Sequence, residues 1–208
     1  MYKLFLLFFF SPFFWMLPGH SQEYDRKAKE AEGLNIGEKA PGFAAKDQQN
    51  NTFSLKEGLT NGPVVMIFYR GHWCPVCNRH LAKLEEQLSQ INKMGATVIA
   101  VSPEKPEYIK ETIEKTGATY TLLHDADYSI SNAYDVTFLP GGITRAIYAT
   151  ALGTAFTDAY PGGSSKLPIP ATYIIGKDQT IVWRHFDPNY KERASVDQIM
   201  AALNNLGY

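Results

Sequence analysis

Apolar and polar residues follow two periods along this chain, and these periods divide it into strands and helices. Two continuously apolar, β-rich runs, at residues 64–69 and 96–102, are typical of strands that are buried on both faces. Between them, residues 75–94 carry apolar positions at helical spacing, and Gly95 follows as a helix stop. Further elements are expected as a helix at 106–115, a strand at 120–123 and a helix at 129–134. This alternation predicts an α/β protein whose central strands are parallel.

Strand pairs are expected at both ends of this alternating region. Residues 43–55 contain two short apolar runs around a polar turn, which predicts an N-terminal β-hairpin. Residues 171–176 and 180–186 are separated by a short polar link, which predicts a second antiparallel hairpin. A last helix is expected over residues 196–204, with Ser195 as its N-cap.

Residues 138–167 interrupt the alternation of strands and helices. Stretches rich in Gly and Pro lie near both ends, and residues 144–152 predict a short amphipathic helix. The segment is too short for a hydrophobic core of its own. We therefore interpret it as an insertion before the late hairpin, of the kind that often forms a lid or a binding loop.

The first residues of the chain predict a targeting segment rather than part of the fold. Lys3 precedes an almost unbroken apolar run at residues 4–17, and small residues stand at Gly19 and Ser21, as a signal peptidase prefers. The run is shorter than the roughly 20 residues that span a bilayer. We therefore expect a signal peptide at residues 1–21 and export, to the periplasm if the organism is bacterial. A membrane partner is expected only if the segment stays uncleaved.

Length and composition fit one globular domain behind that segment. Charged, helix-prone residues at 22–34 predict a solvated lead-in helix, and residues 35–208 are long enough for a single domain with a sizeable core. The formal net charge of −1 gives no reason to expect nucleic acid or an acidic membrane surface as a partner.

The chain has only two cysteines, Cys74 and Cys77, at the predicted start of the 75–94 helix. A disulfide across two intervening residues restrains the unfolded chain little, so the pair is worth more as redox chemistry. A helix N-terminus favours a thiolate at Cys74, and Pro75 suits the first helical turn because that turn needs no N–H from it. We therefore assign Cys74 as the attacking thiolate and Cys77, one turn later, as the resolving thiol. Such a dithiol requires no bound cofactor.

Two other interpretations of these cysteines stay open. The first is an inert structural disulfide. The second is a zinc or Cu(I) site, because four ligand types stand within nine residues: His72, Cys74, Cys77 and His80. Against the metal site, all four come from one short segment, whereas structural zinc sites usually combine two separated pairs.

The residues around the dithiol resemble a superfamily and one of its branches. Residues 73–77, Trp-Cys-Pro-Val-Cys, resemble the active-site motif of the thioredoxin superfamily, and residues 169–172 are similar to its cis-proline loop. The longer run at residues 68–78 resembles the peroxiredoxin-like branch of the AhpC-TSA family, and the resemblance covers residues 35–205. It implies a three-layer thioredoxin fold, with a central mixed β-sheet and helices on both faces.

The resemblance also implies a function and a set of supporting residues. Proteins of this branch reduce hydroperoxides with a dithiol that a thioredoxin-like electron donor restores. The alternative is an exported, thioredoxin-like reductase of protein disulfides. Besides the two cysteines, the supporting residues are Trp73, Pro75, Arg70, the candidate cis-proline Pro170 and Thr172.

The chain departs from the typical peroxiredoxin motif at three positions. Ile67 stands where the family has a proline, and Gly71 stands where it has a threonine or serine hydroxyl. Pro170 stands where the family has an arginine near the late strand. Arg70 is the candidate for the missing positive charge, and Arg79 adds another that favours a thiolate nearby.

Overall fold

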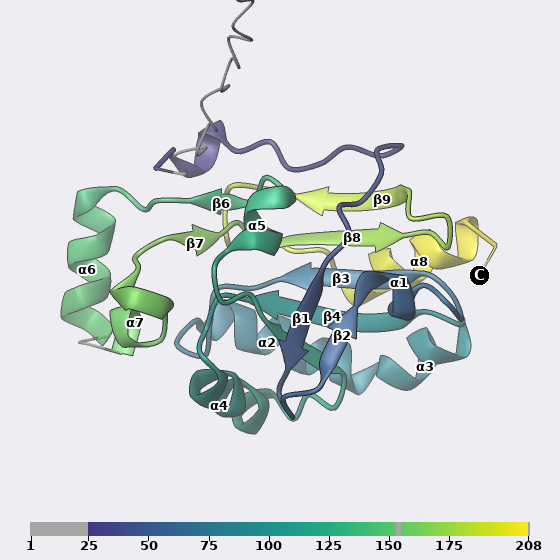
Figure 1. Ribbon diagram of the computed structural model, residues 1–208, viewed down its shortest axis with the longest axis horizontal. Coiled ribbons are helices and arrows are strands. Elements are labelled where there is room, and N and C mark those ends of the chain that lie inside the picture. Colours follow the sequence, from purple (N-terminus) through teal and green to yellow (C-terminus); the bar gives the residue numbers. More distant parts are fainter. Residues whose placement is uncertain (1–24, 153–154, 208) are drawn as a thin grey trace, which may run out of the picture.

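One mixed β-sheet forms the centre of the protein, for which a computed structural model describes residues 25–152 and 155–207 (Figure 1). Its seven strands are β1 (Ala44–Asp47), β2 (Thr52–Ser54), β3 (Val64–Phe68), β4 (Thr97–Ser102), β5 (Thr121–His124), β8 (Ala171–Ile175) and β9 (Ile181–Phe186). They lie in the order β2-β1-β5-β4-β3-β8-β9. β3, β4 and β5 run parallel, while the two hairpins β1–β2 and β8–β9 join the sheet antiparallel. The predicted α/β thioredoxin-like fold is confirmed, including both hairpins.

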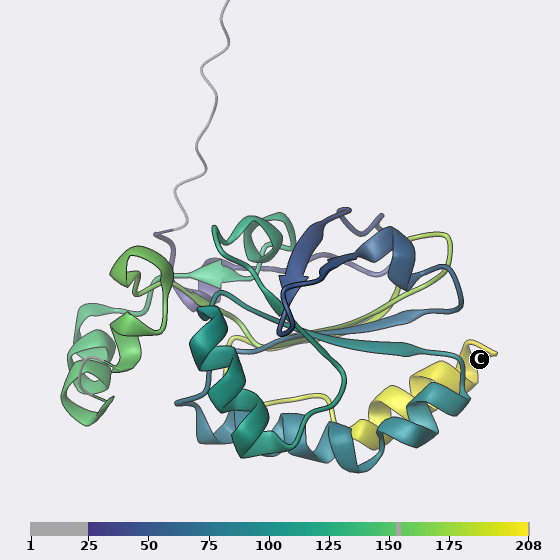
Figure 2. The same cartoon turned by 60° about the horizontal axis from the view of Figure 1, so that its bottom comes forward.

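Helices cover both faces of this sheet and make it the middle of three layers. They are α1 (Leu55–Gly58), α2 (Pro75–Glu86), α3 (Leu88–Lys93), α4 (Pro106–Thr116), α5 (Ser129–Ala133) and α8 (Val196–Asn205). Figure 2 shows α2, α3, α4 and α8 along one face, with α1 and α5 on the other. The side chain of Ser195 accepts from the Gln198 N–H, so the predicted cap of the last helix is confirmed.

The residues of β3 alternate between two hydrophobic cores. Ile67 belongs to the core that also contains Leu81 of α2, whereas Phe68 belongs to the opposite core, where its ring lies 5.5 Å from that of Tyr134. All five residues of β3 are buried. A strand that is buried on both faces needs an unbroken apolar run, which is what the sequence carries there.

The predicted single helix over residues 75–94 is two helices, α2 and α3. Gln87 separates them with φ −115° and ψ 7°, outside the α-helical region. Leu84 and Ile91 remain fully buried on either side of the break. The break redirects the chain while both segments stay packed on the same core.

The described part of the predicted lead-in helix contains only one 3-10 turn, Ala28–Glu30. Neighbouring segments take up the backbone groups that a helix would pair internally. Arg26 O accepts from Leu139 N, and the Glu32 and Gly33 N–H groups donate to Asp135. The expected signal peptide at residues 1–21 lies outside the described residues. Within the described ranges, no helix has the length and apolar character needed to cross a membrane.

The predicted insertion projects from one end of the sheet (Figure 1). It contains α6 (Gly142–Leu152), which confirms the helix expected there, and a short α7 (Ala155–Asp158). Two short strands, β6 (Thr137–Phe138) and β7 (Leu167–Pro168), pair antiparallel where the insertion leaves and rejoins the domain.

The prediction of a cis bond before Pro170 is wrong, because none of the described peptide bonds is cis. Ile169 N donates to Val136 O at 2.7 Å, directly after β7 and two residues before the start of β8. The segment thus passes extended from one strand pairing to the next, and a trans bond continues such a path. The trans form is also the intrinsically preferred one, by about 0.5–1 kcal/mol.

Candidate active site

The two cysteines stand at the N-terminus of α2 and are joined by a disulfide. Cys74 is the N-cap residue and Pro75 is the first helical residue, as the sequence predicts. The Cys74 Sγ accepts the Cys77 N–H at 3.2 Å, which satisfies a donor that the helix leaves free. Cys74 is 3% exposed and Cys77 is fully buried, so a reagent reaches the pair from the Cys74 side.

Arg193 donates from Nη2 to the Cys77 Sγ at 3.2 Å. Its Nε donates to Tyr190 O at 2.9 Å, which fixes the plane of the guanidinium. Burial, and then the charge of Arg70, lower the pKa of Arg193 to about 9, so it remains a cation at neutral pH. Sequence reasoning missed this residue, because 116 positions separate it from Cys77 and no motif surrounds it.

Arg70 is a buried residue that packs on the ring of Tyr190, and it is 4% exposed. Its guanidinium carbon lies 4.1 Å from the centre of the Tyr190 ring, and its Nη1 donates to the Tyr148 hydroxyl at 3.0 Å. Burial lowers the pKa of Arg70. Both guanidinium groups therefore contact Tyr190, Arg70 through the ring and Arg193 through the carbonyl oxygen, and Arg193 is the one that donates to a sulfur.

The insertion holds Trp73, the residue before the dithiol. The indole N–H of Trp73 donates to the Tyr160 hydroxyl at 3.0 Å, and that hydroxyl donates to Arg70 O at 2.8 Å. The Trp73 ring also lies 5.2 Å from that of Phe156 and 5.3 Å from that of Tyr148. The loop that carries Cys74 is thus braced by aromatic residues of the insertion.

Glu104 is a fully buried carboxyl group beneath the same loop, and sequence reasoning did not find it. Its Oε1 accepts the His72 N–H at 2.5 Å and lies 2.7 Å from His72 Nδ1. Its Oε2 accepts from the Thr112 hydroxyl at 3.1 Å. Burial raises the pKa of Glu104, while the hydrogen bonds from His72 oppose that rise. The carboxyl group leaves no room for a side chain at Gly71, where an added Cβ would lie 2.5 Å from Oε1.

The four candidate metal ligands do not converge. The two sulfurs are bonded to each other, and His72 is held by Glu104. His80 donates from Nε2 to Ala194 O at 2.9 Å, and burial lowers its pKa to about 4. In the described part of the chain, no three His, Cys, Asp or Glu side chains are grouped to hold a metal ion. In this disulfide state the four side chains therefore do not form a cluster.

The two candidates from the late hairpin are Thr172, which lies within the sheet, and Pro170, which lies just before it. Thr172 is a buried residue of β8, opposite Ile67 of β3 and His185 of β9. Pro170 is buried just before β8. Thr172 therefore supports β3, the strand that leads into the dithiol loop.

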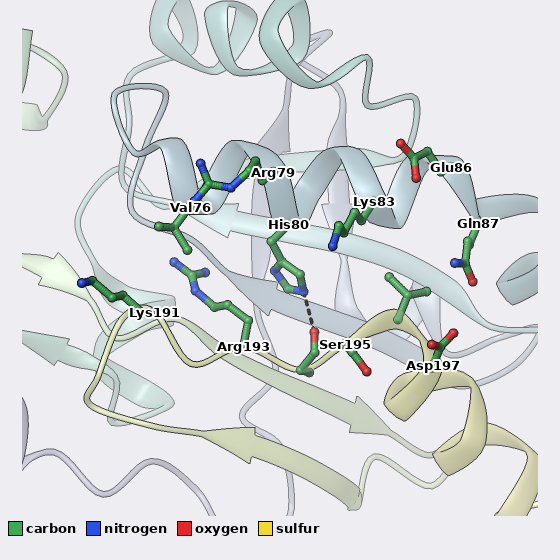
Figure 3. Close-up of a pocket in the computed structure, with 12 residues that line it drawn as sticks. Val76, Arg79, His80, Lys83, Glu86, Gln87, Lys191, Arg193, Ser195 and Asp197 are labelled. Atoms are coloured by element: carbon green, nitrogen blue, oxygen red, sulfur yellow. Dashed lines mark hydrogen bonds between the residues drawn. The ribbon is translucent and has the colours of Figure 1, made fainter.

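Two cavities flank the site. One, of about 470 Å³, lies between α2 and residues 191–197, and Figure 3 shows Arg79 on the helix side and Arg193 on the opposite segment. The other, of about 280 Å³, is lined by Arg70 together with Tyr148 and Tyr190. Each cavity is therefore lined by one of the two arginines, the half-buried Arg193 or the buried Arg70.

Comparison with known proteins gives a consistent result. A family model described as AhpC/TSA family matches residues 36–184. A putative peroxiredoxin bcp of Haemophilus influenzae is 29% identical over 103 residues, which are 50% of this chain and 66% of that protein. The thiol-disulfide oxidoreductase ResA of Halalkalibacterium halodurans is 26% identical over 105 residues, covering 50% of this chain and 58% of the relative. The crystal structure of peroxidoxin BcpB from Mycobacterium tuberculosis superposes with a TM-score of 0.65 at 18% identity, over 83% of this chain and 98% of that one. The matched regions thus span less than two thirds of these two relatives, and the superposition shows the shared fold.

Proposed function

Since this chain belongs to the AhpC/TSA family, we propose that it is a thiol peroxidase of the peroxiredoxin type. The observation that carries the proposal is the Cys74–Cys77 disulfide at the N-terminus of α2. A disulfide in that place is the oxidised product that such a cycle would leave. The name of the Haemophilus influenzae relative, a putative peroxiredoxin, supports a hydroperoxide as the substrate.

The catalytic cycle transfers two electrons from the dithiol to the peroxide. The Cys74 thiolate attacks one peroxide oxygen, the O–O bond breaks, and the alcohol or water leaves with a proton. Cys74 is then a sulfenic acid. The Cys77 thiolate attacks the Cys74 Sγ, the S–O bond breaks, and hydroxide leaves to become water. The helix N-terminus stabilises the Cys74 thiolate through the Cys77 N–H.

An external thiol donor must then reopen the disulfide. The family resemblance supports a thioredoxin-like donor. The apolar segment at residues 4–17 supports export of the protein, to the periplasm if the organism is bacterial. Outside the cytoplasm a dithiol stays reduced only if a reductant is delivered. The supply of electrons from the donor therefore limits the rate of the catalytic cycle.

The test is the rate at which the reduced protein reacts with hydrogen peroxide and with an organic hydroperoxide. We expect one disulfide per peroxide consumed, at a rate far above that of free cysteine. Cys74→Ser should abolish the reaction, while Cys77→Ser should stop it at the sulfenic acid. Reaction no faster than that of free cysteine would remove the peroxidase proposal.

A second candidate function is an exported reductase of protein disulfides. Gly71 favours it, because Glu104 fills the space in which a peroxiredoxin places its threonine or serine side chain. The match to a protein named thiol-disulfide oxidoreductase ResA supports it as well. Comparing the rates of Cys74 oxidation by peroxide and by a protein disulfide, such as insulin, separates the two candidates.

A further inference from the structure

The two sulfurs of the disulfide have different hydrogen-bond donors. The Cys74 Sγ accepts a backbone N–H of α2, whereas the Cys77 Sγ accepts the Arg193 guanidinium at the same distance of 3.2 Å. A guanidinium carries a full charge, and a helix N-terminus carries about half of one. The stronger source of positive charge therefore faces the sulfur that is not the attacking one.

We propose that Arg193 is a catalytic residue that stabilises Cys77 as a thiolate. The role rests on the dithiol cycle proposed above and applies to both of its candidate functions. In the oxidation step Arg193 keeps Cys77 deprotonated for its attack on Cys74. In the reduction step it stabilises Cys77 as the leaving group, and this directs the external thiol to Cys74.

The surroundings of Arg193 favour an interaction with a negative charge formed next to it. In the disulfide state both sulfurs are neutral, yet the charge of Arg70 lies close enough to lower the pKa of Arg193. The Arg193 Nη1 is buried and has no hydrogen-bond partner among the described residues. Reduction places a thiolate beside this unneutralised charge, where interactions are stronger than in water.

The reduction step balances as an ordinary thiol–disulfide exchange. The donor thiolate attacks the Cys74 Sγ, the Cys74–Cys77 bond breaks, and its electron pair leaves on the Cys77 Sγ beside Arg193. A second donor thiolate attacks the donor's own sulfur and releases the Cys74 thiolate. A leaving thiol with a lower pKa leaves faster, so the contact with Arg193 accelerates the first step.

Other titratable and charged groups around Cys77 do not replace Arg193. His80, on the same helix, is neutral at pH 7 because burial lowers its pKa to about 4. His185 of β9 lies near His80, and Arg70 packs on the ring of Tyr190. Arg79 faces the same cavity as Arg193 in Figure 3, but its side chain is exposed to solvent.

The test measures the pKa of the Cys77 thiol in a Cys74→Ser background, where Cys77 is the only cysteine. Thiolate absorbance in the ultraviolet reports it without requiring a reagent to reach a buried sulfur. Arg193→Met should raise this pKa by about 1 to 3. Arg193→Lys should keep the pKa of Cys77 close to that of the parent protein. Arg79→Gln, which removes an equal charge from the same cavity, should leave the pKa of Cys77 nearly unchanged. Equal titration curves for Arg193→Met and its parent, or an equal rise for Arg79→Gln, would overturn the proposal.

A second measurement uses the unaltered protein and does not depend on how Arg193 variants fold. The oxidised protein is mixed with one equivalent of a small thiol, quenched in acid and mapped by mass spectrometry. The donor should be found on Cys74, with Cys77 released; a donor found mainly on Cys77 would refute the leaving-group role. Neither measurement involves peroxide, so failure of the peroxidase proposal would leave both results interpretable.

Discussion

Replacing Gly71 by alanine tests whether Glu104 determines the shape of the dithiol loop. The Cβ added by Gly71→Ala would lie 2.5 Å from Glu104 Oε1, 2.8 Å from Glu104 Cδ and 3.0 Å from Trp73 Nε1. Ordinary van der Waals contact begins near 3.4 Å, so the carboxyl oxygen must retreat by about 0.9 Å. The same oxygen lies 2.5 Å from His72 N and 2.7 Å from His72 Nδ1, so it cannot retreat without weakening these contacts.

The expected cost has two parts. Forcing extra volume into a packed interior costs about 1–3 kcal/mol. Each weakened hydrogen bond to Glu104 adds about 1 kcal/mol. We therefore expect Gly71→Ala to lower the free energy of unfolding by about 2–4 kcal/mol, and the melting temperature by roughly 5–15 °C for a chain of this size.

The assay is equilibrium unfolding in urea with the disulfide intact, and Gly141→Ala is the matched control. Gly141 has no atom within 4 Å of an added Cβ, so its replacement should change stability by less than about 0.5 kcal/mol. Equal stability of the two variants would refute the reasoning, and with it the explanation of why this chain lacks the peroxiredoxin hydroxyl at position 71.

Three further predictions concern other groups around the site. The pKa of His80 is lowered from 6.5 to about 4, so the unfolded chain binds a proton more readily between these pH values. The free energy of unfolding should therefore fall by up to about 3 kcal/mol as the pH drops from 6.5 to 4. In urea unfolding, His80→Gln should remove this dependence of stability on pH. An equal slope in both proteins would exclude His80 as its source. Tyr160→Phe removes the hydroxyl that joins Trp73 to the Arg70 carbonyl. It should lower the free energy of unfolding by about 1–3 kcal/mol in the same assay, because it leaves two polar groups unpaired. An unchanged free energy of unfolding would mean that water replaces the hydroxyl. Cys77→Ser should trap mixed disulfides on Cys74, visible on non-reducing gels, and a protein that traps only in the Cys74→Ser variant would reverse the assigned roles.

The sequence predicted those features that depend on local order. An unbroken apolar run specifies the central strand β3, and the residues that follow specify the start of α2 with Cys74 as its N-cap. The short polar link between β8 and β9 permits only a hairpin. These features depend on neighbours along the chain, so periodicity and turn chemistry were enough to find them.

Features that depend on distant partners were not visible in the sequence. Arg193 and Glu104 reach the dithiol loop from other elements, and neither carries a local signal. The lead-in segment has helix-forming residues, yet its N–H and C=O groups form hydrogen bonds with Asp135 and with the backbone of other segments. The bond before Pro170 follows the strand pairings on either side of it instead of the superfamily pattern. Each of these features is set by contacts between residues that are far apart in the sequence.

The strand pair β6–β7 holds the two ends of the insertion together, so the insertion can be exchanged as one segment. It places Phe138 opposite Leu167, so the two ends of the segment at residues 139–166 are neighbours in space. The sheet and α2 position the cysteines, whereas the insertion supplies the aromatic rings that pack against Trp73. A graft of different length or composition between the same two ends would remodel the entrance to the site and leave the sheet pairings intact. Any such graft would have to keep the Tyr160 hydroxyl, because it joins Trp73 to the Arg70 carbonyl and so connects the insertion to the dithiol loop.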